Sequence, residues 1–340
     1  NGKYKIIMKT EIFKPSKESY IKCGELIRAG QLVAFPTETV YGLGADALNP
    51  DAVRKVYLAK GRPSDNPLIV HIASHGDIEK VARSVPVKAR VVIEKFMPGS
   101  VTVVMPKRPE IPDCVTGGLD TVAVRMPSHP VALEFIRACK VPVCAPSANT
   151  STCPSPTLAE HVIDDLGGKI AAVIDGGPCD VGVESTVIDF AEGEPRLLRA
   201  GGLPVEILEK EIGKIRRDVV SERPLCPGMK YKHYAPAADV TVVLPGASQC
   251  EKTAALYDNL VLQRKKVVIL ALSGHIGNYG ERQTIDVGAD SRAYAHNLFA
   301  ALRECDKRGF DAVIAEGVEQ TGYGLSVMNR VCKSAGGKVI

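Results

Sequence analysis

Short apolar runs alternate with polar, capped stretches along the first two hundred residues of the chain. Apolar runs of four to five residues that are rich in Val, Ile and Leu predict strands, and apolar positions three or four apart predict helices. Strands that alternate with helices are typical of an α/β domain, in which helices pack on a sheet. The predicted strands lie at 32–35, 68–72, 101–105, 121–125, 171–174, 186–190 and 196–199.

Two helices in this region have recognisable ends. The first follows Ser16, a predicted N-cap, and ends before Gly30, which suits a left-handed C-cap. The second begins after Asn49, with a proline at its first position, and ends near Lys60.

The pattern changes after residue 209, where a charged stretch with prolines and glycines runs to residue 238 and predicts a linker. Strand patterns at 240–244, 267–272 and 312–315 then alternate with helical patterns near 248–264 and 291–308. This second alternation predicts a smaller Rossmann-like parallel-sheet domain. We therefore expect a first domain, a linker and a second domain over 9–212, 213–238 and 239–340.

Composition agrees with two domains. The chain has 340 residues, more than one domain usually holds, and 45% of them are hydrophobic. A net charge of +4 is mildly basic, which fits a phosphate-handling enzyme without requiring nucleic acid. Because no apolar run approaches the ~18 residues of a membrane span and no secretory signal is present, we expect a cytoplasmic protein that does not enter a membrane.

The cysteines and histidines give no sign of a metal site in the sequence. The ten cysteines are scattered without a CxxC pair, and the seven histidines form no HxxxH or HExxH group. We therefore expect reduced cysteines and no zinc site.

Polar side chains follow several predicted strands. Thr37 and Thr39 come directly after the strand at 32–35, so we expect them in the crevice at the strands' carboxyl ends, where α/β folds bind ligands. A plain turn explains this segment equally well. Arg125 ends the strand at 121–125 and can bind a carboxylate through two hydrogen bonds. Pairing with Asp120 is an alternative of equal weight.

Two cationic residues lie together at 60–67, in a loop bounded by prolines. Lys60 and Arg62 suit a clamp on phosphate or bicarbonate oxygens, although a lysine at a helix C-terminus also favours the helix dipole. His71, in the following strand, can donate to a carboxylate, but a lone histidine more often has a structural role.

Stiff turns at 145–149 and 154–157 carry hydroxyl and amide groups that can hold a nucleotide. Hydroxyl or cationic side chains also occur at strand ends within 182–186 and 197–202. Each turn alone is ordinary, but five such strand ends favour a binding site. Since no phosphate loop or nucleophile elbow occurs, we expect catalysis by positioning and charge neutralisation.

These segments resemble the Sua5 branch of the YrdC/Sua5 family, the threonylcarbamoyl-AMP synthases. The resemblance covers nearly the whole chain. Its segments lie at 37–44, 60–68, 119–125, 146–149, 182–186, 198–199 and, in the linker, 227–236.

The resemblance implies a YrdC-like twisted mixed sheet with helices, followed by the smaller Rossmann-like domain. It also implies an enzyme that makes L-threonylcarbamoyladenylate and pyrophosphate from L-threonine, bicarbonate or CO2, and ATP. A partner, tRNA threonylcarbamoyltransferase, would then modify adenosine 37 of tRNA.

Site residues follow from the same resemblance. Lys60 and Arg62 would be catalytic, and Mg²⁺ would arrive with ATP, because no carboxylate cage is visible. The linker residues Tyr231, His233 and Tyr234 would close over the pocket as a lid. Threonine would contact Thr37, His71, Arg125 and Ser185. ATP and the bicarbonate-derived group would contact Lys60, Arg62, Asn66, Thr121, Ser147, Asn149, Ser155, Arg199 and Tyr234.

The chain departs from the family pattern at two places. Family members often carry a tryptophan-containing run where this chain has residues 97–102 and no tryptophan, which changes packing. The segment 151–154 lacks a family glycine, which bears on the nucleotide contacts there.

Three other functions compete with this interpretation. An RNA-binding module with weak affinity would use the same cations, but no aromatic-rich basic stretch supports it. A carbamoyl transferase would be expected to carry acylphosphatase-like and zinc-finger modules. A nucleotide site in the second domain, at 272–275, rests on a weak glycine pattern.

Overall fold

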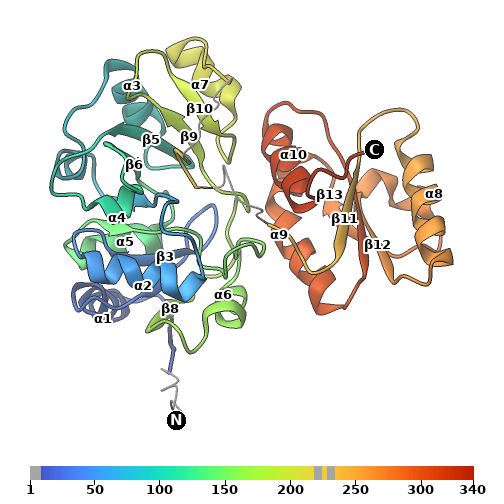
Figure 1. Cartoon of the computed structure of the whole chain (residues 1–340), viewed down its shortest axis with the longest axis horizontal. Helices are drawn as coiled ribbons and strands as arrows, with labels where there is room; N and C mark the ends of the chain where they lie inside the picture. The colour runs from blue at the N-terminus through green and yellow to red at the C-terminus, as the bar shows by residue number, and fades with distance from the viewer. Residues whose placement is uncertain (1–8, 218–223, 228–233) are drawn as a thin grey trace.

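A computed structural model describes residues 9–217, 224–227 and 234–340 of the chain. These residues form a mixed sheet with helices on it and a separate, smaller parallel sheet (Figure 1). The first sheet has the strand order β1 (Glu11–Phe13), β8 (Ala172–Ile174), β2 (Val33–Phe35), β3 (Gly42–Asp46), β7 (Val143–Cys144), β4 (Ile69–His71), β6 (Thr121–Arg125), β5 (Val101–Pro106), β9 (Thr186–Asp189) and β10 (Arg196–Arg199).

All seven strands predicted for the first domain are confirmed within about a residue at each end. The sequence did not predict β1, β3 and β7. Strand β3 begins Gly42-Leu43-Gly44, which suggests a turn, yet the glycines are there for close packing. A Cβ on Gly42 would lie 3.2 Å from the ring of Phe35 on the neighbouring strand, and one on Gly44 would lie 3.0 Å from Val143.

The two predicted helix starts are also confirmed. Helix α1 (Lys17–Arg28) begins after Ser16, whose side chain accepts a hydrogen bond from the Ser19 amide, and α2 (Pro50–Lys60) begins after Asn49. Gly61 ends α2 in the left-handed conformation. The other helices of the first domain are η1 (His75–Lys80), α3 (Val87–Phe96), α4 (Asp113–Thr116), α5 (Pro130–Cys139), α6 (Ala159–Leu166) and α7 (Val205–Ile212).

The two faces of the first sheet are covered by different parts of the chain. On one face Val70, Val103 and Val124 belong to the largest core, with side chains from α2, α3 and α7. On the opposite face, the neighbouring residues Ile69, Val104 and Ala123 pack with Leu225 and Cys226. The described part of the predicted linker therefore covers an apolar face of the sheet.

The second sheet is parallel throughout its described strands, as the sequence predicted. Helix α8 (Gln249–Leu262) packs on one face, and α9 (Ser291–Lys307) and α10 (Tyr323–Ser334) pack on the face toward the first domain (Figure 1). The predicted domain boundaries stay a prediction. The strand order is β11 (Asp239–Val243), β14 (Ala312–Glu316), β12 (Val267–Leu272) and β13 (Thr284–Gly288), with η2 (Ser273–Tyr279) after β12.

Helix α9 docks directly on the backbone of the first domain. His296 Nδ1 lies 2.8 Å from the Asp180 carbonyl oxygen, and Arg303 pairs with Asp165 at 2.9 Å. At Gly182 an added Cβ would lie 2.3 Å from the His296 carbonyl oxygen, so the helix approaches closely because this residue has no side chain. No helix in the described ranges is long and apolar enough to cross a membrane.

Candidate active site

Neighbouring strands bring the predicted site residues to one region of the first sheet. Strands β4 and β6 are parallel, and His71 is the register partner of Arg125, so both side chains end their strands together. Ser185 directly precedes β9, and Arg199 ends the antiparallel strand β10 beside it. The sequence had placed Arg125, Ser185 and Arg199 at strand ends and His71 within its strand.

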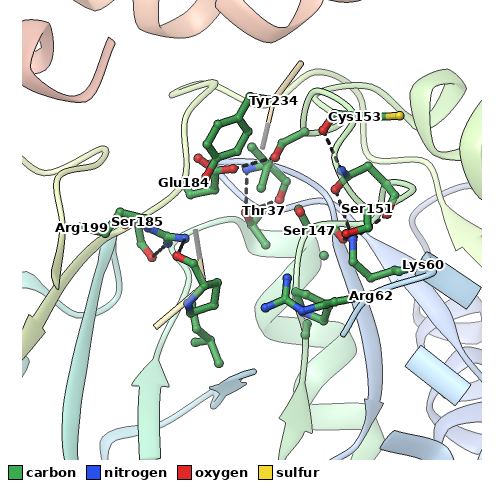
Figure 2. Close-up of a pocket in the computed structure, with 18 of the residues that line it drawn as sticks. Thr37, Lys60, Arg62, Ser147, Ser151, Cys153, Glu184, Ser185, Arg199 and Tyr234 are labelled. Carbon is green, nitrogen blue, oxygen red and sulfur yellow. Dashed lines mark hydrogen bonds between the residues drawn. The ribbon is translucent and has the colours of Figure 1, made fainter. Parts of the chain in front are cut away.

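These residues and the loops around them line one pocket. Asn66 is buried near it without lining it, and Thr121 lies at the far end of β6 from Arg125. In Figure 2, Lys60, Arg62 and Ser147 lie on one side of the pocket, and Glu184, Ser185 and Arg199 lie on the other. The predicted residues that line it are Thr37, Lys60, Arg62, His71, Arg125, Ser147, Asn149, Ser155, Ser185, Arg199 and Tyr234.

Lys60 is buried and holds the turn at 147–149. Its Nζ donates to the Asn149 carbonyl oxygen at 2.6 Å, to Asn149 Oδ1 at 3.3 Å and to the Ser147 carbonyl oxygen. Burial lowers the pKa of Lys60 well below its usual value, and the charge of Arg62 lowers it further. Lys60 thus orients two predicted nucleotide contacts as well as contributing charge to the pocket.

Arg62 presents an open edge of its guanidinium. Its Nη2 donates to the carbonyl oxygens of Asn66 at 3.3 Å and Pro67 at 3.1 Å, while Nε has no partner among the described residues. A buried donor without a partner costs about 1–3 kcal/mol. The site is therefore suited to an anion that Arg62 can bind.

Arg125 pairs with Glu38, and the alternative pairing with Asp120 is wrong. Arg125 Nη2 lies 2.7 Å from Glu38 Oε1 and both side chains are buried, whereas Asp120 precedes the opposite end of β6. The second Glu38 oxygen accepts from the Ser128 amide at 3.2 Å. Glu38 is thus a site residue that the sequence analysis missed, although it lies in the 37–44 segment.

His71 is a neutral imidazole at physiological pH. Burial, with the nearby charge of Arg125, lowers its pKa to about 3. Its Nδ1 lies 3.1 Å from the Ile69 carbonyl oxygen, which can only accept, so Nδ1 carries the proton and Nε2 is left as an acceptor. His71 therefore donates to its own strand, a structural contact that also fixes the ring for ligand binding.

Arg199 and Ser185 are joined by hydrogen bonds on the opposite wall. Arg199 Nε donates to the Ser185 carbonyl oxygen and Nη2 to Ser185 Oγ, both at 3.1 Å. Arg199 Nη1 reaches the carbonyl oxygen of Pro227 at 3.3 Å. The linker and this wall are therefore in direct contact.

Glu184 connects the pocket to the second domain. It accepts from Ser155 Oγ at 2.6 Å and from Nε of Arg330, in α10, at 3.1 Å. Burial alone would raise the Glu184 pKa, but Arg330, Arg199 and Ser155 outweigh it and lower the pKa to about 2. Neither Glu184 nor Arg330 was predicted as a site residue, and nothing in the sequence pairs two residues 146 positions apart.

Tyr234 closes the pocket at the end of the linker. Its ring stacks on Phe299 of α9 with centroids 5.2 Å apart, and the Arg330 guanidinium lies 5.7 Å from its centroid. The next residue, Ala235, donates its amide to the Thr152 carbonyl oxygen at 2.9 Å. Tyr231 and His233, the other predicted lid residues, lie outside the described residues.

Thr37 forms a tight turn at the pocket wall. Its hydroxyl donates to the Val40 carbonyl oxygen at 2.6 Å and accepts from the Thr39 and Val40 amides. The turn suggested as an alternative is therefore present, and it places Thr37 in the pocket lining.

Comparison with known proteins identifies the family. A family described as "Telomere recombination" matches residues 25–201, and one described as "Threonylcarbamoyl-AMP synthase, C-terminal domain" matches 203–336. The chain belongs to the Sua5 family. It is 49% identical to the threonylcarbamoyl-AMP synthase of Pyrococcus abyssi, over 92% of this chain and 93% of that protein. It is 46% identical to that of Bacillus subtilis, over 93% and 92%.

A solved Sua5 structure has the same two-domain arrangement. The structure of P. abyssi Sua5 complexed with L-threonine matches with a TM-score of 0.92 and 46% identity, covering 97% of this chain and 98% of that one. Since the match spans both domains, the placement of the second domain against the first is shared with that structure.

Proposed function

We propose that this Sua5 protein is an L-threonylcarbamoyladenylate synthase, a nucleotidyltransferase that uses L-threonine, bicarbonate or CO2, and ATP. The observation that carries the proposal is the pocket, in which four cationic side chains face hydroxyl and amide groups within a fold matching threonine-complexed Sua5. Relatives that are 39–49% identical over most of the chain are named for this activity.

The threonine half of the site is proposed around Arg125. Its Nε has no partner among the described residues and is a donor for the threonine carboxylate. His71 Nε2 and the Ser185 hydroxyl suit the hydroxyl and amine of threonine, and Thr37, whose hydroxyl is bonded within its own turn, would line this half of the site. With a pKa of about 3, His71 is too weak a base to take a proton at pH 7, so its role is to position the substrate.

The ATP half is proposed around Arg62 and Arg199. The threonine amine forms a C–N bond to CO2 with loss of a proton, or to bicarbonate with loss of water, and so becomes a carbamate. A carbamate oxygen then attacks the α-phosphorus as the bond to pyrophosphate breaks. The two guanidiniums would neutralise charge that builds up on the phosphate oxygens. Ser147, Asn149 and Ser155 would hold the nucleotide, with Lys60 keeping their turn in place.

We also propose that Mg²⁺ enters with ATP. Among the described residues that line the pocket, Glu184 is the one carboxylate, and Ser155 and Arg330 already occupy its two oxygens. Mg²⁺ keeps several waters and suits phosphate bridging, so it would neutralise ATP phosphates without a protein cage.

The product is a labile mixed anhydride and needs an acceptor. We propose that a tRNA threonylcarbamoyltransferase takes the threonylcarbamoyl group to adenosine 37 of tRNA, in the cytoplasm. The lid segment that ends at Tyr234 would limit hydrolysis before transfer.

The test is pyrophosphate release by the purified chain, with the adenylate measured by mass spectrometry. We expect release to require ATP, Mg²⁺, L-threonine and bicarbonate together, and to fall to background when any one is omitted. Release with ATP alone would contradict the proposal. RNA binding without pyrophosphate release would favour the RNA-binding alternative.

A further inference from the structure

A cluster of three metal-binding side chains lies in the second domain, away from the pocket described above. Cys250, His275 and Glu316 each offer one ligand atom, and these atoms all lie within 4.8 Å of one another. The sequence predicted no zinc site because the three residues are far apart in the chain and belong to no spacing motif. The fold alone brings them together.

The three cluster residues lie at or after the ends of three strands, at one edge of the parallel sheet. Glu316 ends β14, the strand between β11 and β12 in the sheet. Cys250 lies in the first turn of α8, which follows β11, and His275 lies in η2, which follows β12. The carboxyl ends of parallel strands are where folds of this kind bind ligands.

Glu316 is a buried carboxylate with little charge to balance it. Its side chain is 0% exposed, and among the described residues the imidazole of His275, at 2.9 Å, is the one basic side chain within salt-bridge distance. A buried carboxylate is costly unless it is paired or binds a metal. A divalent cation at this position would supply the missing positive charge.

The surrounding contacts are those of a metal site with an outer shell. One Glu316 oxygen accepts from the Leu272 amide at 2.6 Å, and the other accepts from the Tyr279 hydroxyl. His275 and Cys250 also donate hydrogen bonds to Glu316, and a bound cation would take the place of these two protons. The Leu272 amide and the Tyr279 hydroxyl would remain and keep the carboxylate oriented. The imidazole is 35% exposed, which gives an ion access from solvent.

Helix α8 positions Cys250 beside the other two cluster residues. Gln249 fixes the start of the helix by donating from Nε2 to the carbonyl oxygens of Val243 at 3.0 Å and Gly317 at 2.8 Å. This contact holds Cys250 in place, with its Sγ 3.9 Å from Glu316 Oε1.

We propose that Cys250, His275 and Glu316 bind Zn²⁺ in the second domain. One thiolate, one imidazole and one carboxylate are a ligand set that selects zinc over magnesium or calcium, and three protein ligands leave a fourth position for water. The ion would join the ends of β11, β12 and β14 and stabilise the second domain. This site is independent of the proposed adenylation chemistry.

The test is Co²⁺ titration of the metal-stripped full-length protein, with Co²⁺ as a spectroscopic substitute for Zn²⁺. We expect one equivalent to bind with a near-ultraviolet thiolate-to-cobalt charge-transfer band, and Zn²⁺ to abolish the band. Cys250→Ser should lose the band, and His275→Gln should weaken Co²⁺ binding about tenfold or more while keeping it. Cys332→Ser, at another half-buried cysteine of the domain, is the matched control and should behave like the wild type.

Thermal unfolding provides a second readout that does not depend on activity. Saturating Zn²⁺ should raise the melting temperature of the wild type and of Cys332→Ser by a few degrees, roughly as expected for a ligand that binds the folded state only. Cys250→Ser should show no such shift. Absence of the charge-transfer band in the wild type, or an equal band in Cys250→Ser, would overturn the proposal and leave a purely hydrogen-bonded cluster around Glu316.

Discussion

Arg125 is held by one carboxylate while keeping a donor for another. Glu38 occupies its Nη2, and Nε has no partner among the described residues. We predict that Arg125→Ala raises the KM for threonine about 10- to 100-fold, because a charge-assisted hydrogen bond is worth about 1.5–3 kcal/mol. The KM for ATP should change much less in steady-state pyrophosphate assays. Arg54→Ala, at an exposed ion pair on α2, is the control, and an unchanged threonine KM in Arg125→Ala would place the carboxylate elsewhere.

His71 links the site to the pH dependence of stability. Its pKa is about 3 when folded and about 6.5 when unfolded, so below pH 6.5 the unfolded chain takes up a proton that the folded chain does not. Folding stability is therefore lost as the pH falls, by about 2 kcal/mol between pH 6.5 and pH 5 from this residue. Urea unfolding followed by circular dichroism should show a smaller loss over this range in His71→Gln. An identical loss would show that other groups dominate.

The side chains that end strands could be predicted from the sequence, but their partners could not. His71, Arg125 and Arg199 were identified because each follows an apolar run in a predictable place. The pairing of Arg125 with Glu38 spans 87 positions and depends on how β2, β3 and β6 are ordered in the sheet. Sequence periodicity contains no information about that order, so the wrong partner, Asp120, was weighed instead.

Among the elements, the linker was the hardest to interpret from sequence. Its charged and proline-rich composition predicted a connection between domains, yet Leu225 and Cys226 cover an apolar sheet face and Pro227 contacts Arg199. Strands built on an apolar run and helices with capping residues were predictable because those patterns are local. Short strands such as β7, and a segment that packs without regular structure, have no periodicity to detect.

Gly182, in the loop before β9, permits the docking of helix α9. We predict that Gly182→Ala lowers the melting temperature and increases the radius of gyration in solution scattering, because a Cβ would lie 2.3 Å from the His296 carbonyl oxygen and separate the domains. Gly193→Ala is a matched control, since Gly193 also has positive φ but nothing lies within 4 Å of its added Cβ. That control isolates backbone strain, about 1–2 kcal/mol. Equal effects of both changes would mean that α9 can move aside.

At the scale of the whole molecule, the second domain contacts residues that form one wall of the pocket. Arg330 is fully buried between the domains, where it donates to Glu184 and to the Ala200 carbonyl oxygen and lies over the Tyr234 ring. Glu184 in turn holds Ser155. The domains are therefore connected through the same residues that line the site, so a change in docking should alter nucleotide binding.

Arg330→Met tests this connection. The substitution leaves the Glu184 carboxylate buried without its main partner, so we predict a loss of about 3–5 kcal/mol in stability and a higher KM for ATP as the Ser155 wall shifts. Lys307→Met, which removes an exposed interdomain pair with Glu160, should cost at most about 1 kcal/mol and leave the KM unchanged. Adding Glu184→Gln to Arg330→Met should recover part of the stability, since no unpaired charge then remains buried. If Arg330→Met destabilises the protein but leaves ATP kinetics unaltered, the contact serves domain docking alone and the pocket is complete without the second domain.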